Sequence, residues 1–501
     1  MRLFFIKNKT KIFKLLYCLV ISFLVLMICS KNSFLYPFNN WVDENAFFTV
    51  GKAWGYGLIP YRDMFEQKGP VLFLIFTLSS FISSRTFIGV FIFEIISFTI
   101  FLYYVIKIVN LFINKNLTYL FLPLIAVLIA SSPFFAHGGS AEEFCLPLLM
   151  YTFYSFLKVF VCDNDISYKN LFINGLIAGV ILLIKFTILG FWFGFMASLF
   201  FYFIINKKYK KAFISCLVFL SGMFIPMLVF SLYFLLVGGF REFIDVYFKF
   251  NIFNYSGSQP VLSRIKQAFS IFYREMSVSF VYLSLIYVGF LYFIFSNNFI
   301  KNKVHKLFVV AFIGFGILGV FWGCKEFVYY FLMIMSFVIL GFIMIGNYIT
   351  NEVKLDTMKY CFIGGIILVL SVHYIGNSSN IEYMKNKKSD IVQYKFAKII
   401  HENNGKTLLN YGAIDGGFYM AANIIPNVKY FESINANVPG MDEFLEKKIK
   451  KRSFDYIVIR TYPGYNPIND NIKDNYDKVS VGKEINEGME FKYYLYERKG
   501  M

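Results

Sequence analysis

Residues 41–70 have the sequence WVDENAFFTVGKAWGYGLIPYRDMFEQKGP and follow the first hydrophobic segment of the chain. Two acids, Asp43 and Glu44, lie near the start of this stretch, and Gln67-Lys68-Gly69-Pro70 closes it. A carboxylate can take a proton from a hydroxyl group, and a nearby cation can stabilise a departing phosphate. The stretch therefore predicts a reactive loop just outside a membrane helix.

The composition is that of a membrane protein. The chain has 501 residues, of which 57% are hydrophobic and 21% aromatic, and Phe alone occurs 65 times. A soluble globular chain is normally about 45–50% apolar. The net charge of +18 does not indicate nucleic acid, because much of the lysine lies in short segments between apolar runs, where it sets topology and meets anionic lipid. We expect membrane lipids, and no nucleic acid, among the partners.

Apolar runs recur along the first three quarters of the chain. A membrane helix needs about 20 apolar residues, and about eleven segments meet this requirement. They are residues 12–30, 86–106, 117–132, 143–161, 170–186, 188–205, 212–237, 277–296, 305–322, 327–346 and 358–376. The shorter apolar segment 70–83 opens with Pro70 after Gly69. We expect it to be a helix that lies on the membrane surface and continues the first outer loop.

The distribution of lysine and arginine sets the orientation of these spans. A cytoplasmic N-terminus places inside the basic residues Arg2, Lys7, Lys9, Lys11, Lys107, Lys115, Lys169, Lys207, Lys208, Lys210, Lys211, Lys301, Lys303, Lys306 and Lys354. The short outer turns carry only Lys325, so the bias is positive-inside. The outer segments are then 31–85, 133–143 and 238–276, and the C-terminus lies outside. If segment 70–83 crossed the membrane, every later loop would change sides.

The last quarter of the chain has a different pattern. Residues 407–411, 455–460 and 491–496 resemble strands, and residues 441–452 have the periodicity of a helix with a charged face. The sequence thus predicts an α-helical polytopic membrane domain over residues 1–376. A small extracytoplasmic α/β domain is expected over residues 377–501.

Further polar residues lie near the outer ends of the predicted spans. Arg62 and Asp63 share the first loop with Lys68, and Arg and Lys both suit phosphate. The pair Glu142-Glu143 begins a predicted helix, where the helix dipole stabilises an acid. Capping needs one acid and explains only one of them. His137, just before this pair, could join a metal or phosphate site.

Two charged residues lie within the apolar segments themselves. Lys185 stands between two spans with almost no loop, and Glu94 falls inside the second span. A charge there is costly unless it reaches an interface or a partner. Each therefore predicts either a functional role or a buried partner.

The order of these motifs resembles the GT-C glycosyltransferases, in the bacterial branch that includes the aminoarabinose and protein O-mannosyl transferases. Their first outer loop is similar to Asp43-Glu44, Gly51, Gly57-Leu58-Ile59-Pro60-Tyr61-Arg62-Asp63 and Lys68-Gly69-Pro70. Their acidic second outer loop is similar to Gly139-Ser140-Ala141-Glu142-Glu143-Phe144, and Lys185 matches a recurring feature. The resemblance covers about residues 10–350 and is strongest in the first 190.

The resemblance implies a hexosyl- or pentosyltransferase of the plasma (inner) membrane. It would move a sugar from a polyprenyl-phosphate donor to a lipid, glycan or protein acceptor at the outer face. On this analogy the catalytic residues are Asp43, as the base, and Glu44. The donor phosphate would be held by Lys68, Arg62 and Lys185. The acceptor, or a metal ion, would be bound by Glu142, Glu143, Asp63 and His137.

One departure from the family pattern concerns the residue before the lysine. The aminoarabinose branch has an acid there, whereas this chain has Gln67, with Glu66 one position earlier. The resemblance therefore does not carry a metal role over to this position, and whether a divalent metal ion serves as a cofactor stays open.

Two other functions are compatible with a polytopic chain. A transporter or flippase for lipid-linked saccharides would need essential charges near the bilayer midplane and two similar halves. A polymerase of such saccharides would have its main outer loop later in the chain, as at 238–276.

Overall fold

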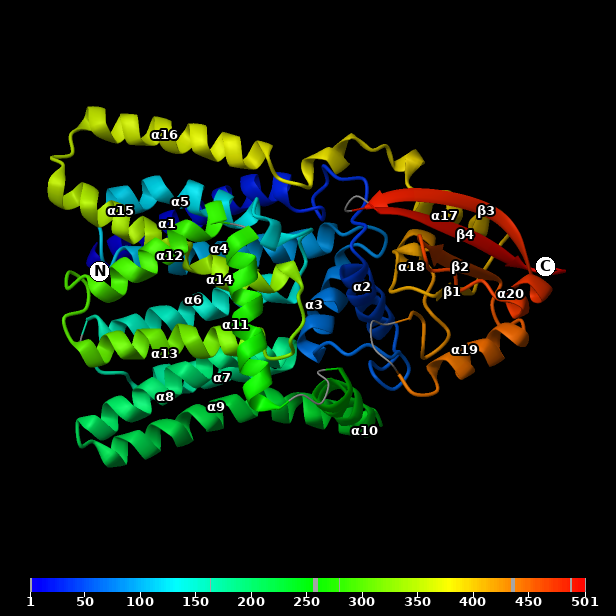
Figure 1. Cartoon of the computed structure of the whole chain (residues 1–501), viewed down its shortest axis with the longest axis horizontal. Coiled ribbons are helices and arrows are strands. Elements are labelled where there is room, and N and C mark those ends of the chain that lie inside the picture. Colours follow the sequence, from blue (N-terminus) through cyan, green and yellow to red (C-terminus); the bar gives the residue numbers. More distant parts are fainter. Residues whose placement is uncertain are drawn as a thin grey trace. The chain divides into compact units, whose positions relative to one another are not determined.

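The computed structural model describes residues 2–162, 164–255, 260–278, 280–433, 438–486 and 489–500 (Figure 1). The chain forms two compact units, each assembled from three separate segments. Unit 1 comprises Met1–Ser30, Phe93–Phe230 and Gln259–Ile381. Unit 2 comprises Lys31–Ile92, Ser231–Ser258 and Glu382–Met501.

Unit 1 consists of helices, most of them long and apolar, because a helix satisfies all its backbone polar groups internally when no water is present. They are α1 (Arg2–Cys29), most of α4 (Ile88–Val109), α5 (Lys115–Ala130), α6 (Ala141–Phe160), α7 (Tyr168–Lys185), α8 (Gly190–Ile205), most of α9 (Tyr209–Leu236), α11 (Val261–Val278), α12 (Phe280–Phe295), α13 (Lys303–Val320), α14 (Leu332–Met335), α15 (Ile339–Glu352) and α16 (Thr357–Gly376). In Figure 1, α11 runs across the direction of α6, α7 and α13.

Eight segments within the described residues are long and apolar enough to cross a membrane. They are Lys11–Cys29, Ile88–Val109, Ala141–Phe160, Tyr168–Ile205, Tyr209–Leu236, Lys303–Val320, Val328–Glu352 and Thr357–Gly376. Shorter apolar helices are Pro70–Ile82, Lys115–Ala130 and Tyr282–Phe295. Every predicted span falls on one of these segments, and Tyr168–Ile205 holds two of them. The polytopic helical architecture is confirmed, whereas the number of about eleven spans stays a prediction.

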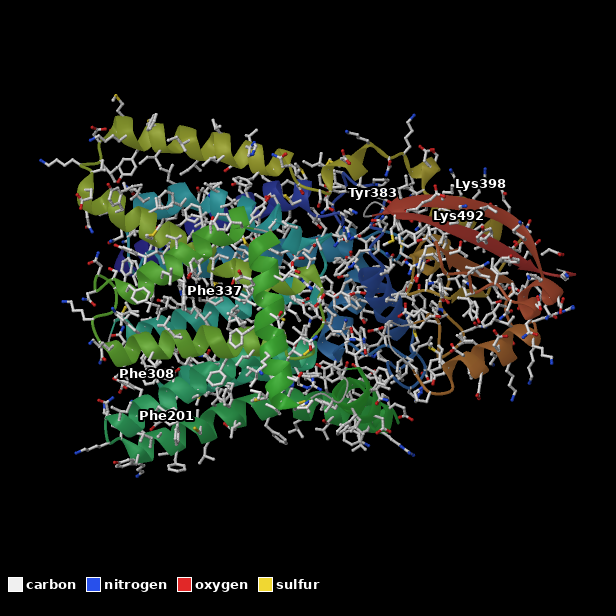
Figure 2. The ribbon with its side chains drawn as sticks, viewed as in Figure 1. Phe201, Phe308, Phe337, Tyr383, Lys398 and Lys492 are labelled. Carbon is white, nitrogen blue, oxygen red and sulfur yellow. The ribbon has the colours of Figure 1, made fainter. Side chains whose placement is uncertain are left out.

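Unit 1 has large apolar side chains on its outside as well as in its interior, as expected for a protein in lipid. Phe337 is 1% exposed and lies inside the helices, whereas Phe201 on α8 is 56% exposed and points outward (Figure 2). Large exposed apolar surfaces are unusual on soluble monomers. Such outward-facing rings fit contact with hydrocarbon.

Glycine allows α8 and α13 to pack closely. A Cβ atom at Gly190 would lie 2.1 Å from the carbonyl oxygen of Phe315. One at Gly194 would lie 2.8 Å from the Cα atom of Phe312. Small residues at such interfaces are typical of membrane helices, where van der Waals contact between backbones drives association.

Unit 2 combines the first loop with the C-terminal part of the chain. Its helices are α2 (Val42–Gly55), α3 (Pro70–Ile82), α10 (Phe240–Glu242), the π-helix η3 (Phe243–Tyr255), α17 (Val392–Glu402), α18 (Phe418–Ala422), α19 (Met441–Lys450) and α20 (Asp470–Asn475). Its strands are β1 (Leu408–Tyr411), β2 (Tyr456–Thr461), β3 (Tyr476–Asn486) and β4 (Met489–Arg498).

The sheet has the strand order β1-β2-β4-β3, with β1 parallel to β2 and the other pairs antiparallel. The strands predicted at 407–411, 455–460 and 491–496 correspond to β1, β2 and β4, and the predicted helix to α19. Aromatic rings pack the helices on the sheet. The ring centroid of Phe418 lies 5.6 Å from that of Phe396 on α17 and 5.2 Å from that of Tyr493 on β4. Lys398 and Lys492 point outward from this part of the unit (Figure 2).

The first loop is ordered around two packed helices. A Cβ atom at Gly51 of α2 would lie 2.6 Å from the Cβ atom of Phe76 on α3, so the helices approach closely. Thr77 donates its hydroxyl to the Gly51 carbonyl at 2.9 Å. The helix predicted at 70–83 exists as α3, with Pro70 at its start, where its missing N–H costs nothing. Its location on the membrane surface stays a prediction.

The segment 238–276 differs from our expectation of a long loop. It contains α10, η3 and most of α11. Our search for apolar runs missed α11 because that helix is amphipathic, with Arg264 and Lys266 among its apolar residues.

Candidate functional site

The acids Asp43 and Glu44 lie in the first turn of α2, where the helix dipole favours negative charge. Glu44 is fully buried and accepts a hydrogen bond from the side-chain amide of Asn39. Asn39 also accepts the Trp41 N–H at 3.0 Å, and Asn45 donates to the Asn39 carbonyl at 3.0 Å. Glu44 thus fixes the start of the helix, whereas Asp43 is partly exposed.

Lys68 is held by its backbone on both sides. Its N–H donates to Glu66 Oε1 at 3.2 Å, and its carbonyl accepts the Tyr61 hydroxyl at 2.7 Å. Tyr61 is fully buried and has a φ of 69°, so the turn before Lys68 is tightly determined. The Lys68 ammonium lies 5.6 Å from the centroid of the Phe47 ring. The backbone of Lys68 is therefore fixed on both sides, and its ammonium lies over a ring of α2.

The structure brings Asp43 and Lys68 into one electrostatic neighbourhood. Burial raises the pKa of Tyr255, and the charges of Lys68 and Asp43 then act on it in opposite directions. The same two charges act on the pKa of Glu66. Asp43 and Lys68 therefore both lie near Glu66 and Tyr255 in unit 2.

Arg62 and Asp63 form a two-point ion pair. Arg62 Nε and Nη2 each lie 2.8 Å from an oxygen of Asp63, and Nη1 donates to the Val237 carbonyl at 2.7 Å. Asp63 also accepts the Ile59 N–H at 2.8 Å. Hydrogen bonding to Arg62 lowers the pKa of Asp63. The pair fixes the turn of the first loop, and the phosphate role of Arg62 stays a prediction.

A buried cluster of acids in unit 2 was not predicted. Glu432 and Asp415 come from the C-terminal part and are 1% and 0% exposed. Glu432 Oε2 accepts the Asp415 N–H at 2.6 Å, and Asp415 accepts the Thr49 hydroxyl at 2.6 Å and the Gly417 N–H at 2.8 Å. The only signal in the sequence is that Glu432 directly follows two aromatic residues, Tyr430 and Phe431.

The burial of Asp415 can be tested, because it makes the stability of the protein depend on pH. Burial raises the pKa of Asp415 from 3.8 to about 6. Because the pKa of Asp415 is higher in the folded protein than in the unfolded chain, the protonated carboxyl group favours the folded state. This contribution to stability is fully present below pH 3.8 and is lost as the pH rises through about 6. We expect Asp415→Asn to stabilise the protein by about 1–3 kcal/mol at pH 7.5, since each pKa unit corresponds to about 1.36 kcal/mol. The hydrogen bond to Thr49 can be kept in this variant, because the amide of asparagine can donate to the Thr49 hydroxyl oxygen.

The measurement is the melting temperature in detergent between pH 4.5 and 7.5. The advantage of Asp415→Asn should shrink as the pH falls. The matched control is Asp470→Asn, because the Asp470 side chain is 91% exposed. Parallel curves for the wild type and Asp415→Asn would contradict the expectation.

In unit 1, Glu142 and Lys185 form a buried ion pair. Their side chains are 2% and 13% exposed. The Lys185 ammonium also lies 3.2 Å from the centroid of the Tyr330 ring and 5.7 Å from that of Tyr329. The pair joins the first turn of α6 to the last residue of α7. It explains how Lys185 is accommodated between two apolar helices.

Glu143 takes part in the N-terminal cap of α6, whereas Glu142 forms the ion pair with Lys185. The Glu143 N–H donates to Ser140 Oγ at 3.1 Å, and its Oε2 accepts the Gly139 N–H at 3.0 Å. The Gly139 N–H also donates to Glu94 Oε1 at 2.8 Å, and Ser30 Oγ lies 2.9 Å from Glu94 Oε2. Glu94 therefore has buried partners, which was one of the two interpretations of its position.

His137 lies beside the same turn. Its Nδ1 is 3.4 Å from Asn380 Oδ1, and Asn380 donates to the carbonyls of Cys29 and Ala136, each at 2.7 Å. Within the described part of the chain, no three His, Cys, Asp or Glu side chains converge on a metal site. The predicted residues of the first loop thus fall in unit 2, and those of the second loop, with Lys185, in unit 1.

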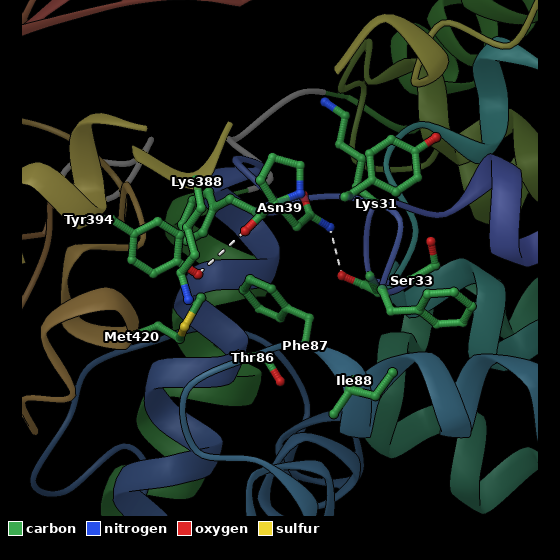
Figure 3. A pocket seen from close by; sticks show the side chains of 14 residues that line it. Lys31, Ser33, Asn39, Thr86, Phe87, Ile88, Lys388, Tyr394 and Met420 are labelled. Carbon is green, nitrogen blue, oxygen red and sulfur yellow. Dashed lines mark hydrogen bonds between the residues drawn. The ribbon is translucent and has the colours of Figure 1, made fainter. Parts of the chain in front are cut away.

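Unit 2 also contains a cavity of about 300 Å³ (Figure 3). Aromatic rings line it, with Phe38 lying 6.1 Å from Phe87 and 5.6 Å from Tyr394. Asn39 lines it as well, and this is the residue that donates to Glu44. The cavity therefore reaches the residue that holds Glu44 in place.

Two ammonium groups border this cavity. Lys388 lies 4.4 Å from the centroid of the Tyr394 ring. Lys31 donates to Asn40 Oδ1 at 2.9 Å and lies 4.6 Å from the Tyr383 ring. Figure 3 shows Lys388 and Tyr394 on one side of the view and Lys31 on the other. Rings with a few charged groups are typical of a site for a polar organic ligand.

No family model and no curated protein sequence matches this chain. The solved structures do give matches. ArnT from Cupriavidus metallidurans bound to undecaprenyl phosphate is similar with a TM-score of 0.56 at 10% identity, covering 97% of this chain and 98% of that one. The apo state of the same ArnT has a TM-score of 0.57 at 9% identity, with the same coverage.

The match confirms the predicted GT-C fold. It also goes beyond the resemblance found in the sequence, which covered about residues 10–350. Because 97% of the chain is covered, the C-terminal α/β part belongs to the shared fold. At this level of identity the likeness concerns the fold alone.

Proposed function

Because the chain has the GT-C fold, we propose that it is a membrane glycosyltransferase that takes a sugar from a polyprenyl-phosphate donor. The acceptor is a lipid, glycan or protein, and transfer takes place at the outer face of the plasma membrane. The observation that carries this proposal is the position of the Lys68 ammonium, 5.6 Å from the ring centroid of Phe47, which follows Asp43 by about one helical turn on α2. Undecaprenyl phosphate bound to the ArnT of the same fold supports the donor class.

The proposed reaction needs one base and one cation. Asp43 takes the proton from an acceptor hydroxyl, whose oxygen bonds to the anomeric carbon of the donor sugar. The bond between that carbon and the phosphate oxygen breaks, and polyprenyl phosphate leaves with the electron pair. The ammonium of Lys68 stabilises the negative charge that develops on the phosphate.

The proposed phosphate-binding role of Lys68 can be tested through the affinity of the protein for polyprenyl phosphate, the leaving group. We expect Lys68→Met to weaken the binding of undecaprenyl phosphate about 10- to 100-fold, because a hydrogen bond to a charged group is worth about 1.5–3 kcal/mol. The measurement is the Kd in detergent micelles. Lys447→Met on the exposed face of α19 is the matched control and should bind as the wild type does. Equal affinity of Lys68→Met and the wild type would remove Lys68 from the donor site.

The cavity beside Asn39 supports an acceptor that carries an anionic group. Aromatic rings can pack on sugar faces, and Lys388 and Lys31 at its border suit a phosphate or a carboxylate. We expect Lys388→Met to raise the KM for such an acceptor about 3- to 5-fold with kcat unchanged, because an exposed charge contributes up to about 1 kcal/mol. Lys398→Met, whose side chain is 76% exposed, is the control. An unchanged KM would separate the cavity from the acceptor.

A further inference from the structure

Two buried carboxyl groups from distant parts of the chain meet beside Lys68. Glu66 of the first loop is 6% exposed, Glu432 of the C-terminal part is 1% exposed, and their side chains are hydrogen-bonded to each other. Glu66 Oε1 accepts the Lys68 N–H at 3.2 Å. Glu432 is thus one hydrogen bond away from the residue that holds the backbone of Lys68.

The backbone around this pair is fixed as well. The Phe65 N–H donates to the Lys429 carbonyl at 2.8 Å. The ring of Phe65 lies 5.6 Å from that of Tyr430 and 5.4 Å from that of Phe250. The Asn251 amide donates to the Gln67 carbonyl at 2.8 Å. Residues 65–67 are therefore held by the segment 429–430 and by η3.

A hydrogen bond between two carboxyl groups requires a proton. Two carboxylates in contact repel each other, so one of the pair is protonated. Glu432 Oε2 accepts the Asp415 N–H, and within the described residues Glu432 Oε1 meets no N–H or O–H donor of the protein. A proton shared with Glu66 satisfies this oxygen.

The surrounding charges assign the proton to Glu432. Burial raises the pKa of Glu432 well above its usual range, and the charges of Glu66 and Asp415 add to the effect. Burial also raises the pKa of Glu66, but the ammonium of Lys68 opposes this rise. Glu432 therefore donates, and Glu66 accepts as a carboxylate. The titratable groups that face the pair are Asp43, Tyr61, Lys68, Tyr255, Asp415 and Tyr419.

We propose that Glu432 is a positioning residue for Lys68: its carboxyl group holds Glu66, and Glu66 holds the backbone of Lys68. This inference rests on the proposed function, in which Lys68 holds the donor phosphate. It gives the C-terminal part of the chain a role in binding the donor, although Glu432 itself touches neither substrate.

The positioning role predicts a change in KM for the donor rather than in kcat. We expect Glu432→Ala to raise the donor KM about 10-fold with kcat within about 3-fold of the wild type, because Glu66 loses its buried hydrogen-bond partner. Glu432→Gln keeps a neutral donor and should have a donor KM close to that of the wild type at pH 7. Glu443→Gln, on the exposed side of α19, is the matched control.

The pH profile distinguishes positioning from a purely structural role. The wild-type donor KM should rise at alkaline pH as the shared proton is lost, whereas in Glu432→Gln this rise should disappear. The melting temperature, measured beside it, reports folding. An unchanged donor KM in folded Glu432→Ala, or a wild-type alkaline rise in Glu432→Gln, would overturn the inference. Absence of turnover in the wild type would overturn the proposed function and the inference together, whereas wild-type turnover with an unchanged donor KM in Glu432→Ala would overturn the inference alone. The two failures are therefore distinguishable.

Discussion

Asp43→Asn is expected to lower kcat for sugar transfer about 100- to 10,000-fold, the range that a positioned general base contributes. Asparagine has the same shape but cannot accept the proton of the acceptor hydroxyl. Asp43 is partly exposed in the first turn of α2, whereas its neighbour Glu44 is buried against Asn39. The variant should therefore fold, enter the membrane and melt as the wild type does.

The measurement is single-turnover transfer at saturating donor and acceptor. Asp470→Asn makes the same chemical change at an exposed position of unit 2 and should retain full activity. Transfer by folded Asp43→Asn at the rate of the wild type would show that the base lies elsewhere.

The second large effect is expected on stability, from Lys185→Met. This change leaves Glu142, whose side chain is 2% exposed, without its cation. Removing one partner of a buried ion pair costs about 3–5 kcal/mol. The contact of the ammonium with the Tyr330 ring, at 3.2 Å, is lost as well. Unfolding by denaturant in detergent should show the loss.

Two further variants identify the cause of this loss. Lys185→Met combined with Glu142→Gln should recover most of the stability, because the uncompensated charge is gone. Lys211→Met, which breaks the more exposed pair with Asp165, should cost at most about 1 kcal/mol. If Lys185→Met is as stable as the wild type, the pair does not carry the packing of α6 on α7. If the double variant is stable but does not bind donor, Lys185 also has the predicted phosphate role.

Much of the fold was predictable because its determinants are local. The apolar runs follow from the length of a membrane helix, and every predicted span falls on an apolar helix. The strands β1 and β2 are buried and rich in β-branched and aliphatic residues, which makes them visible in the sequence. The edge strand β3 was missed because Val479, Val481 and Ile485 are exposed and lysines interrupt them, a pattern typical of protected sheet edges.

The candidate site was predictable only where its residues are close in sequence. Asp43 and Lys68 belong to one loop, and their motifs carry the resemblance to the GT-C family. Glu432 and Asp415 could not be found in this way, because they reach the first loop only through folding, by contacts with Glu66 and Thr49. The ion pair of Lys185 with Glu142 is hidden for the same reason.

The central claim is that Asp43 and Lys68 act on a polyprenyl-phosphate sugar. The most direct test reconstitutes the purified wild type in lipid and follows the release of polyprenyl phosphate from a panel of polyprenyl-phosphate sugars. A membrane-lipid extract supplies the acceptor, and Asp43→Asn is assayed in parallel. The account predicts that the wild type consumes at least one donor and that Asp43→Asn does not. A folded wild type that consumes none of them, or equal consumption by Asp43→Asn, would contradict it.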